Sequence, residues 1–257
     1  MGKIIAVVNQ KGGVGKTTTS INLSDNLSLL GKNVLLIDLD SQGSATTSLG
    51  INRMILNSTI KDLFLEKKEI EDIIVKPRYS NIDLIPATID FASIEYELLD
   101  NEFREYILYE ALNKVRHLYD YIIMDCPPAL GFVTINALQA ADTVIVPVQC
   151  HFLALDGLTQ LLNTIRIVQK SKKVNNRELS LEGVLITMLD KRIKMSWEVI
   201  KEIKDYFGEK VFKTFITMNV SCQVAPAHGM PVSKYDKKGV AAKLYKELAK
   251  EVIKNNG

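Results

Sequence analysis

Short apolar runs alternate with amphipathic stretches along most of the chain. The apolar runs are rich in Val, Ile and Leu, as buried parallel strands are, and they occupy residues 3–9, 33–38, 121–125, 143–148, 181–187 and 211–216, with a shorter candidate at 82–85. Apolar positions at helical spacing predict helices at 17–30, 132–140, 155–171, 196–207 and 239–254. This alternation predicts an α/β fold with a doubly wound, mostly parallel sheet, helices on both faces and ligands at the carboxyl ends of the strands.

No linker or repeat divides this pattern. Residues 50–116 are less regular and more charged, and we expect them to form helices beside the sheet. A chain of 257 residues with 47% hydrophobic positions can bury one large core, so a single domain spanning 1–257 is expected. The absence of a long apolar run and of a signal-peptide layout predicts a cytoplasmic protein. Three cysteines without paired spacing indicate neither a disulfide framework nor a zinc site.

Charge is distributed unevenly although the net charge is only +2. Residues 191–257 carry 14 Lys and Arg against 7 Asp and Glu, whereas residues 1–190 carry 18 against 23. A basic C-terminal quarter is typical of a face that meets a polyanion. Solvated lysines on helix faces are the alternative, and composition alone does not decide between the two.

A glycine-rich loop joins the first apolar run to the first helical pattern. It reads Lys11, Gly12, Gly13, Val14, Gly15, Lys16, Thr17 and Thr18. Glycines let backbone N–H groups surround phosphates, and the positive end of the following helix adds to that field. Lys16 is expected to reach the outer phosphates and Thr17 to ligate magnesium. The usual phosphate-loop spacing has glycine at Gln10, so this loop is a variant with a second lysine at its mouth.

Carboxylates follow two of the predicted strands. Asp38 and Asp40 come after the second strand, and Asp40 is our candidate for orienting the attacking water. Two kinds of role remain open for Asp38. It either takes part directly in the metal site, or it supports the metal ligands or caps a helix. Asp125 ends the apolar run 121–125 and is expected to hold magnesium through water, opposite Thr17. Cys126 beside it is expected to pack in the interior.

These motifs resemble those of the ParA, MinD and nitrogenase iron protein superfamily. The run K-G-G-V-G-K-T-T looks like the deviant Walker A motif of that superfamily, and residues 121–128 look like its Walker B motif and second switch. Residues 38–46 resemble its first switch, D-x-D-P-Q-G-N-A-T, with Ser41 and Ser44 replacing the proline and the asparagine. The resemblance covers essentially the whole chain. It is closest to small Soj-type ParA proteins, which lack a separate N-terminal DNA-binding domain.

The resemblance implies an ATP-driven cycle on a P-loop NTPase fold, with ATP and Mg²⁺ as cofactors and a weak basal ATPase rate. Lys11 would cross a homodimer interface to the nucleotide of the facing subunit, which makes Lys11, Lys16 and Asp40 the expected catalytic set. The ATP-bound dimer would bind nonspecific double-stranded DNA, and a ParB-like protein would stimulate hydrolysis and release. Such a protein would be associated with the nucleoid in the cytoplasm.

Two further sets of residues follow from the same resemblance. The closing region resembles the segment that holds adenine in ParA proteins, which indicates Asn219 and Pro226, with Met218 in a position usually filled by arginine. Arg192 matches a DNA-contacting arginine, while a second basic position of the family is Ser221 here. The patch is therefore either weak or completed elsewhere, and its candidate residues are Lys191, Arg192, Lys194, Lys234, Lys237, Lys238 and Lys243.

Three alternatives to this interpretation agree less well with the sequence. A MinD-like membrane-associated ATPase would use a C-terminal amphipathic helix, but the apolar positions of 239–254 fit core docking better because they include no Trp or Phe. A non-enzymatic nucleotide-binding adaptor is disfavoured by the joint presence of Lys16, Thr17, Asp40 and Asp125. Residues 187–190 read T-M-L-D and lack the lysine of a guanine-reading T-K-x-D motif, which favours ATP over GTP.

Overall fold

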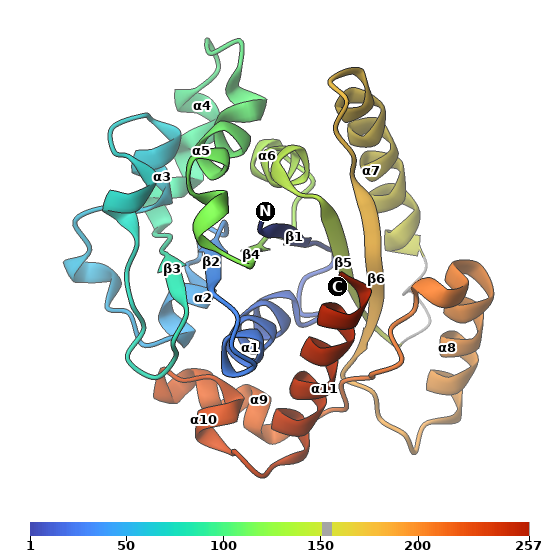
Figure 1. Cartoon of the computed structure of the whole chain (residues 1–257). Coiled ribbons are helices and arrows are strands. Elements are labelled where there is room, and N and C mark those ends of the chain that lie inside the picture. Colours follow the sequence, from blue (N-terminus) through green and yellow to red (C-terminus); the bar gives the residue numbers. More distant parts are fainter. Residues whose placement is uncertain (151–155, 257) are drawn as a thin grey trace.

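A six-stranded, fully parallel sheet forms the centre of the molecule in the computed structural model, which describes residues 1–150 and 156–256 (Figure 1). Its strand order is β3-β2-β4-β1-β5-β6. The strands are β1 (Lys3–Val7), β2 (Val34–Asp38), β3 (Asp83–Ile85), β4 (Tyr121–Asp125), β5 (Thr143–Gln149) and β6 (Ser180–Thr187).

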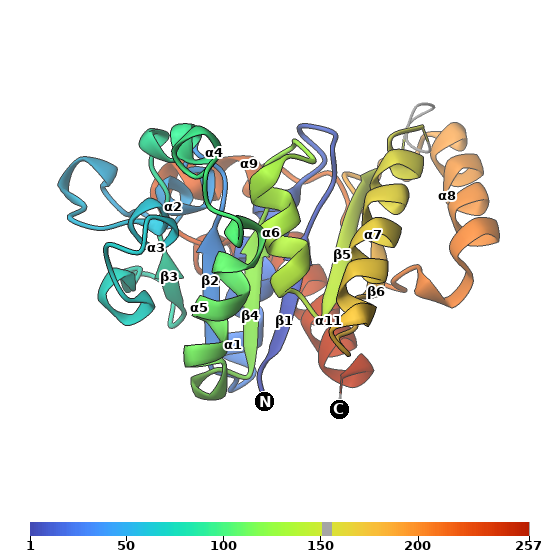
Figure 2. The same cartoon turned by 90° about the horizontal axis from the view of Figure 1, so that it is seen from above.

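Helices cover both faces of the sheet. One face carries α5 (Ile107–Val115), α6 (Phe132–Ala140) and α7 (Asp156–Val174), and the other carries α1 (Lys16–Leu29) and α11 (Val240–Asn255) (Figure 2). The predicted doubly wound α/β fold is therefore confirmed. The remaining helices are α2 (Ser44–Ser48), α3 (Ile60–Phe64), α4 (Ile94–Glu97), α8 (Lys194–Phe207), α9 (Val220–Val224) and α10 (Val232–Tyr235). Short 3₁₀ turns are η1 (Arg53–Ile55), η2 (Ile70–Ile73), η3 (Ile89–Ser93), η4 (Arg104–Tyr106), η5 (Arg116–Leu118), η6 (Gly208–Lys210) and η7 (Ala225–His228).

Most predicted elements lie within two or three residues of their observed bounds, and the predicted helix start at residue 155 falls outside the described residues. The strand predicted at 211–216 is wrong, because this segment forms only one isolated bridge to β6, at Val211. Phe212 and Ile216 donate their amides to β6, at 3.0 and 2.9 Å. The amides between them, of Lys213 and Thr214, bond instead to the Glu251 carboxylate of α11, at 2.7 and 3.1 Å. An acid from a neighbouring helix thus interrupts the ladder.

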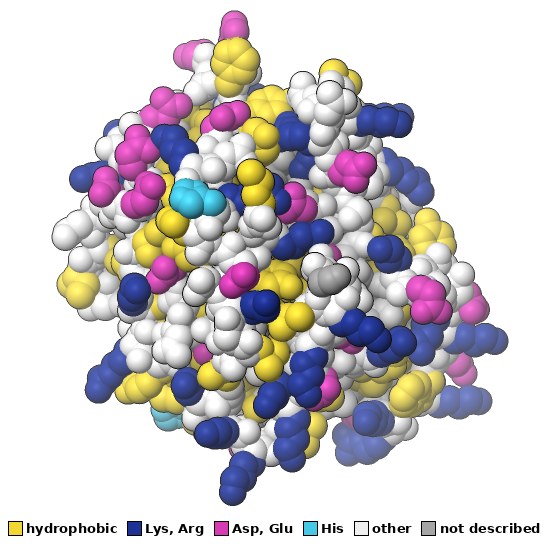
Figure 3. Space-filling model, in the orientation of Figure 1, with side chains coloured by type: hydrophobic (Ala, Val, Ile, Leu, Met, Phe, Trp, Pro, Cys, Tyr) yellow, Lys and Arg dark blue, Asp and Glu magenta, His cyan; other side chains and the backbone are white. Residues whose placement is uncertain are grey.

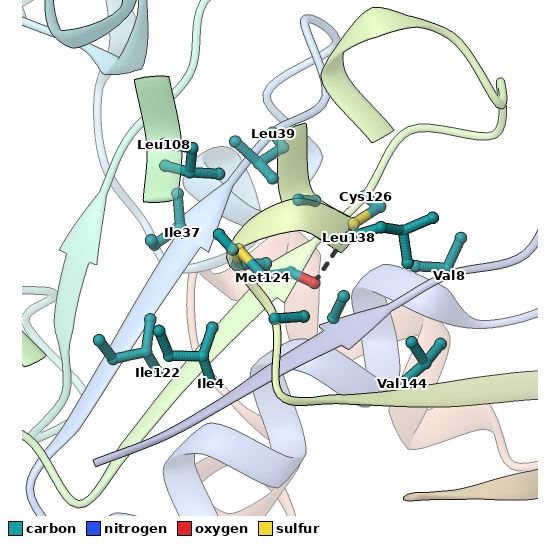
Figure 4. Packing of buried hydrophobic residues seen from close by; sticks show 14 of the residues in the cluster. Ile4, Val8, Ile37, Leu39, Leu108, Ile122, Met124, Cys126, Leu138 and Val144 are labelled. Carbon is teal, nitrogen blue, oxygen red and sulfur yellow. Dashed lines mark hydrogen bonds between the residues drawn. The ribbon is translucent and has the colours of Figure 1, made fainter. Parts of the chain in front are cut away.

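Each face of the sheet has its own apolar core, since alternate residues of a strand point to opposite faces. Figure 4 shows the core under α5 and α6, where Ile4 and Ile122 of neighbouring strands lie side by side and Ile37 lies near Leu108 of α5. Cys126 is buried in this cluster with its Sγ 3.8 Å from the Met124 carbonyl (Figure 4). Burial also raises the pKa of the Cys126 thiol. These contacts agree with the predicted packing role of Cys126.

Lys172 joins α7 to the end of α6. Its ammonium is buried and donates hydrogen bonds to three carbonyl oxygens at the carboxyl end of α6, those of Leu138, Gln139 and Ala141. A cation at this position satisfies carbonyls that have no partner within the helix and complements the helix dipole. Burial nevertheless lowers the pKa of Lys172 to about 8.

The C-terminal helix α11 packs its apolar face on α1 and the sheet. Tyr245, Leu248 and Val252 are almost completely buried there, whereas Val240 at the start of the helix is exposed. The structure confirms the prediction that this helix packs on the core. Among the described residues, none of the helices has the length and apolarity that a membrane span needs.

Candidate nucleotide-binding site

The glycine-rich loop connects β1 to α1 at the carboxyl edge of the sheet. Gly13 and Gly15 have φ angles of +74° and +86°, a conformation that favours glycine. A Cβ atom at Gly12 or Gly13 would meet nothing within 4 Å, so the outer side of the loop is open. The first backbone N–H groups of α1 point toward the same space, which suits an anion. Loop and helix together form a cradle of phosphate-binding type.

Two polar side chains hold this loop in place. The Asn9 amide donates to the Pro147 carbonyl at 2.7 Å, and its Oδ1 accepts the Lys11 N–H at 3.0 Å. On the other side, the Thr187 hydroxyl donates to the Val14 carbonyl at 2.8 Å. The loop is thereby fastened to β5 and β6. Sequence reasoning did not single out Asn9 or Thr187 for this role, because both partners are backbone atoms distant in the chain.

The two lysines of the loop occupy different environments. Lys16 is only 8% exposed, and its Nζ donates to the Lys11 carbonyl at 3.2 Å. Burial lowers the pKa of Lys16, while the nearby Asp125, Cys126 and Asp40 act in the opposite direction. Lys11 itself is half-buried, and its backbone carbonyl is the acceptor for Lys16.

Asp38 and Asp125 face one another across paired strands. β2 and β4 pair with Asp38 opposite Asp125, and both side chains are completely buried. Burial raises the pKa of both carboxyl groups, and for Asp125 the negative charge of Asp38 adds to the rise. A buried acidic pair of this kind favours a nearby cation, because positive charge relieves both the burial and the repulsion.

Asp125 has one oxygen bonded and one open. Ser20 of α1 donates to Oδ1 at 2.9 Å, and the Thr17 hydroxyl also hydrogen-bonds to the carboxylate. Oδ2 is buried without a hydrogen-bond partner among residues 1–150 and 156–256. An orphaned carboxylate oxygen beside a threonine hydroxyl and an anion cradle fits a magnesium ion held through water. Ser20 was missed from the sequence, although it lies one helical turn after Lys16.

The carboxylate of Asp38 accepts hydrogen bonds from the segment that follows β2. Its Oδ2 accepts the Thr46 amide at 2.8 Å and the Thr46 hydroxyl at 2.7 Å, while Oδ1 accepts the Asp40 amide at 3.2 Å. The Thr46 hydroxyl in turn accepts the Ala87 N–H at 3.0 Å. Of the predicted roles for Asp38, these contacts match helix capping. Thr46, which sequence reasoning did not single out, connects β2, α2 and the segment after β3.

Asp40 lies half-buried in the loop between β2 and α2. Its Oδ1 accepts the Gln42 amide at 2.9 Å, and its carbonyl accepts the Gly43 amide at 2.8 Å. These two bonds close a tight turn that fixes the carboxylate on the same edge of the sheet as the glycine-rich loop. We refer to residues 40–43 as the switch turn.

The residues predicted to hold the base lie on two sides of the start of α1. Met218 and Asn219 line one hollow with Thr18, and Pro226 lines a neighbouring hollow with Thr17. Asn219 also caps α9, accepting the Ser221 amide at 2.8 Å. The first hollow is completed by Cys222, Gln223 and Tyr245. These three were not predicted, because their position depends on α9 and α11 folding back over α1.

Polar residues of α1 anchor this C-terminal segment. Asn22 accepts the Val232 amide at 2.8 Å, and Asp25 accepts the hydroxyl of Ser233. A second hydroxyl, that of Ser80, donates to Asp25 at 2.6 Å. Polar side chains of α1 therefore anchor the start of α10, which follows the predicted adenine-holding segment 219–229.

Two glycine backbones meet between α2 and η7. Gly50 and Gly229 have φ angles of +77° and +65°. A Cβ atom on Gly229 would lie 2.7 Å from the Gly50 Cα, and one on Gly50 would lie 3.0 Å from the Gly229 carbonyl oxygen. The residue that follows α2 and its C-cap is thus in direct backbone contact with Gly229, at the end of the predicted adenine-holding segment 219–229.

The predicted DNA-contacting residues fall into two groups on the surface. Lys191, Arg192 and Lys194 lie before and at the start of α8, and the other four lysines lie on α10 and α11 and in the segment between them. All seven are exposed. In Figure 3, Lys and Arg side chains gather over the lower and right-hand parts of this face, where Figure 1 places α8, α10 and α11.

Arg192 is paired with an acid of its own loop. Its Nε and Nη2 donate to the two carboxylate oxygens of Asp190, at 2.9 and 2.7 Å. These hydrogen bonds lower the pKa of Asp190 to about 2, although the Arg192 side chain is 89% exposed. Ser221, the position at which the resemblance leads to the expectation of a basic residue, donates to Asp236 at 2.9 Å. The basic patch is therefore partly neutralised around Arg192.

Comparison with known proteins gives close, full-length relatives. Residues 2–181 match a family model described as an AAA domain. The chain is 51% identical over 255 residues to the sporulation initiation inhibitor protein Soj of Bacillus subtilis (strain 168), covering 99% of this chain and 100% of that protein. It is 44% identical over 257 residues to the chromosome-partitioning ATPase Soj of Treponema pallidum (strain Nichols), covering 100% of this chain and 99% of that protein.

Solved structures agree with this match. A crystal structure of cobyrinic acid a,c-diamide synthase from Mycobacterium smegmatis with bound ATP analog and magnesium superimposes with a TM-score of 0.87 at 36% identity. The match covers 99% of this chain and 95% of that chain. Sequence, fold and the order of the motifs thus lead to one assignment: this chain belongs to the Soj/ParA family of chromosome-partitioning ATPases.

Proposed function

We propose that this chain is a single-domain ATPase that binds ATP and Mg²⁺ and forms a homodimer when ATP is bound. The dimer partitions DNA in the cytoplasm, in association with the nucleoid. The single observation that carries this proposal is the convergence of the glycine-rich loop, Asp40 and Asp125 at one edge of the sheet. The family membership and the ATP analog and magnesium in the M. smegmatis structure support the choice of ligands.

The residues at this edge have different roles in the proposed transfer of a phosphoryl group to water. Lys16 and the N–H groups of the loop hold the phosphates, and magnesium supplies charge neutralisation when bound. The Thr17 hydroxyl would ligate magnesium, and the open oxygen of Asp125 would hold it through water. Asp40 orients the attacking water, because it is a carboxylate held by a closed turn. Asp38 keeps α2, and with it the switch turn, in place.

Pairing of two copies depends on Lys11 in this proposal. One lysine suffices for the phosphates of its own subunit, and Lys16 already fills that position behind the loop. Lys11 is the second lysine of the loop, and in this proposal it reaches the nucleotide of the facing subunit. ATP then favours the paired state, and a ParB-like protein stimulates hydrolysis, which ends it.

In this proposal, exposed Lys and Arg side chains bind DNA without sequence specificity. Phosphate contacts of this kind carry affinity and weaken steeply with salt. Arg192 is the first candidate, and the lysines of α10 and α11 supply a second group on the same basic face.

A salt series of DNA binding tests the proposal. Binding of an arbitrary labelled duplex is measured by fluorescence anisotropy with ATP, with ADP and without nucleotide, for the wild type, Arg192→Ala and Arg78→Ala. Arg78 is an exposed arginine near β3 and serves as the charge-matched control. We expect ATP-dependent, sequence-independent binding that only Arg192→Ala weakens. Equal affinity with ADP and ATP contradicts the proposed switch.

A further inference from the structure

Arg53 of η1 reaches back to the switch turn. Its Nη1 donates to the Gln42 carbonyl at 2.5 Å. The turn that carries Arg53 is itself capped, since the Asn52 side chain accepts the Met54 amide at 3.0 Å. A guanidinium bound to a carbonyl is a charge-assisted hydrogen bond, which is roughly twice as strong as a neutral one. The contact therefore joins two loops that are separated by α2.

The Arg53 side chain also lies against Gly43. A Cβ atom at position 43 would be 2.8 Å from the Arg53 Nη1 and 2.9 Å from its Cδ. Gly43 has a φ of +61°, so both its conformation and the space beside it require glycine. Arg53 thus contacts the peptide unit between Gln42 and Gly43 with its head and with its aliphatic stem.

That peptide unit is part of the turn that holds Asp40. The Gln42 amide donates to the Asp40 carboxylate, and the Gly43 amide donates to the Asp40 carbonyl. Arg53 bonds to the carbonyl of Gln42 and lies against Gly43. The switch turn is consequently held by both Asp40 and Arg53, and a displacement of Gln42 would move the amide that holds the Asp40 carboxylate.

Arg53 makes no ion pair with a carboxylate in the described part of the chain, so its contact with the loop is not secondary to a surface salt bridge. We propose that Arg53 is a positioning residue for ATP hydrolysis, which holds the switch turn so that the Asp40 carboxylate keeps the orientation needed to align the attacking water. This proposal rests on the proposed role of Asp40. Positioning of reacting groups is sensitive to displacements of about 1 Å, which can cost about 100-fold in rate.

The test compares kcat and KM for ATP in the wild type, Arg53→Met, Arg53→Lys and the control Arg78→Met. Methionine keeps an unbranched apolar stem but removes the donor, and lysine restores a cationic donor. We expect Arg53→Met to lower kcat about tenfold with KM within about twofold, and Arg53→Lys to recover most of the rate. Arg78→Met should behave as the wild type. Arg53 is exposed, and circular dichroism checks that each variant is folded.

Coupling to Asp40 separates positioning from a general loss of stability. In an Asp40→Ala background, Arg53→Met should change the residual single-turnover rate by less than about twofold, because the group that it orients is gone. The proposal is overturned if Arg53→Met keeps wild-type kcat, or if its effect persists undiminished without Asp40. A wild-type rate in Asp40→Ala alone would instead contradict the proposed catalytic role of Asp40.

Discussion

Replacing Thr46 by valine removes one hydroxyl from the site without changing the shape of the side chain. That hydroxyl donates to the buried Asp38 carboxylate at 2.7 Å and accepts the Ala87 N–H at 3.0 Å. Valine and threonine have similar helix propensities, so the change of backbone preference is small. Thr46→Val is therefore a direct measure of what the hydroxyl contributes to folding.

The expected destabilisation follows from the two lost bonds. A hydrogen bond to a charged group contributes about 1.5–3 kcal/mol, and a buried N–H left without a partner costs about 1–3 kcal/mol. Asp38 retains the Thr46 amide, which reduces the first of these losses. We expect the free energy of unfolding to fall by about 3 kcal/mol, a factor of more than 100 in the folding equilibrium.

Urea denaturation followed by circular dichroism measures this change. Thr46→Ser is the matched control, because it keeps the hydroxyl and removes only a methyl group, which costs about 1 kcal/mol in a buried position. Thr164→Val, in the more accessible part of α7, should change stability by less than about 0.5 kcal/mol. A loss below about 1 kcal/mol for Thr46→Val, or an equal loss for serine and valine, would refute the reasoning.

Three other predictions concern more distant parts of the molecule. Because burial lowers the pKa of Lys172 from 10.5 to about 8, the unfolded chain binds more protons between these values, so the free energy of unfolding should rise with pH across that window. Urea midpoints at pH 7.5, 9 and 10.5 should show this rise, and Lys172→Met should flatten it. Gly229→Ala should lower the free energy of unfolding by more than about 1 kcal/mol, since its φ of +65° and the contact with Gly50 both exclude a Cβ atom. An unchanged melting temperature would contradict this prediction. Asp190→Asn should raise ATP-dependent DNA affinity about three- to tenfold by releasing Arg192 from its ion pair, whereas weaker binding in anisotropy titrations would mean that Asp190 orients the arginine for DNA.

The parts of the fold that were predictable are those with a strong local signal. The apolar run 121–125 became β4 with the same bounds, and the helix predicted at 132–140 became α6 unchanged. The segment 211–216 carries the same apolar signal but is not a strand. Its middle amides are bonded to Glu251, and no pattern within 211–216 contains information on a carboxylate from the last helix.

The candidate site could be proposed from the sequence where its residues belong to short motifs. Lys16, Thr17, Asp40 and Asp125 were identified because each belongs to a short run at the end of a strand. The groups that hold them were not identified, because their partners are remote in sequence. Thr46 is typical of these groups, since a threonine in a polar loop has many possible roles until Asp38 and Ala87 are placed beside it.

The meeting of Gly50 and Gly229 has a mechanical consequence. Side chains between two segments can change rotamer, and they thereby accommodate a shift of about a few tenths of an ångström. At this contact the main chain of Gly50 touches the main chain of Gly229 directly. A small sideways movement of the segment around Gly229 must be followed by the end of α2 or be prevented by it. If residues 219–229 hold adenine as proposed, binding of the base and the position of the switch turn are coupled through these two glycines.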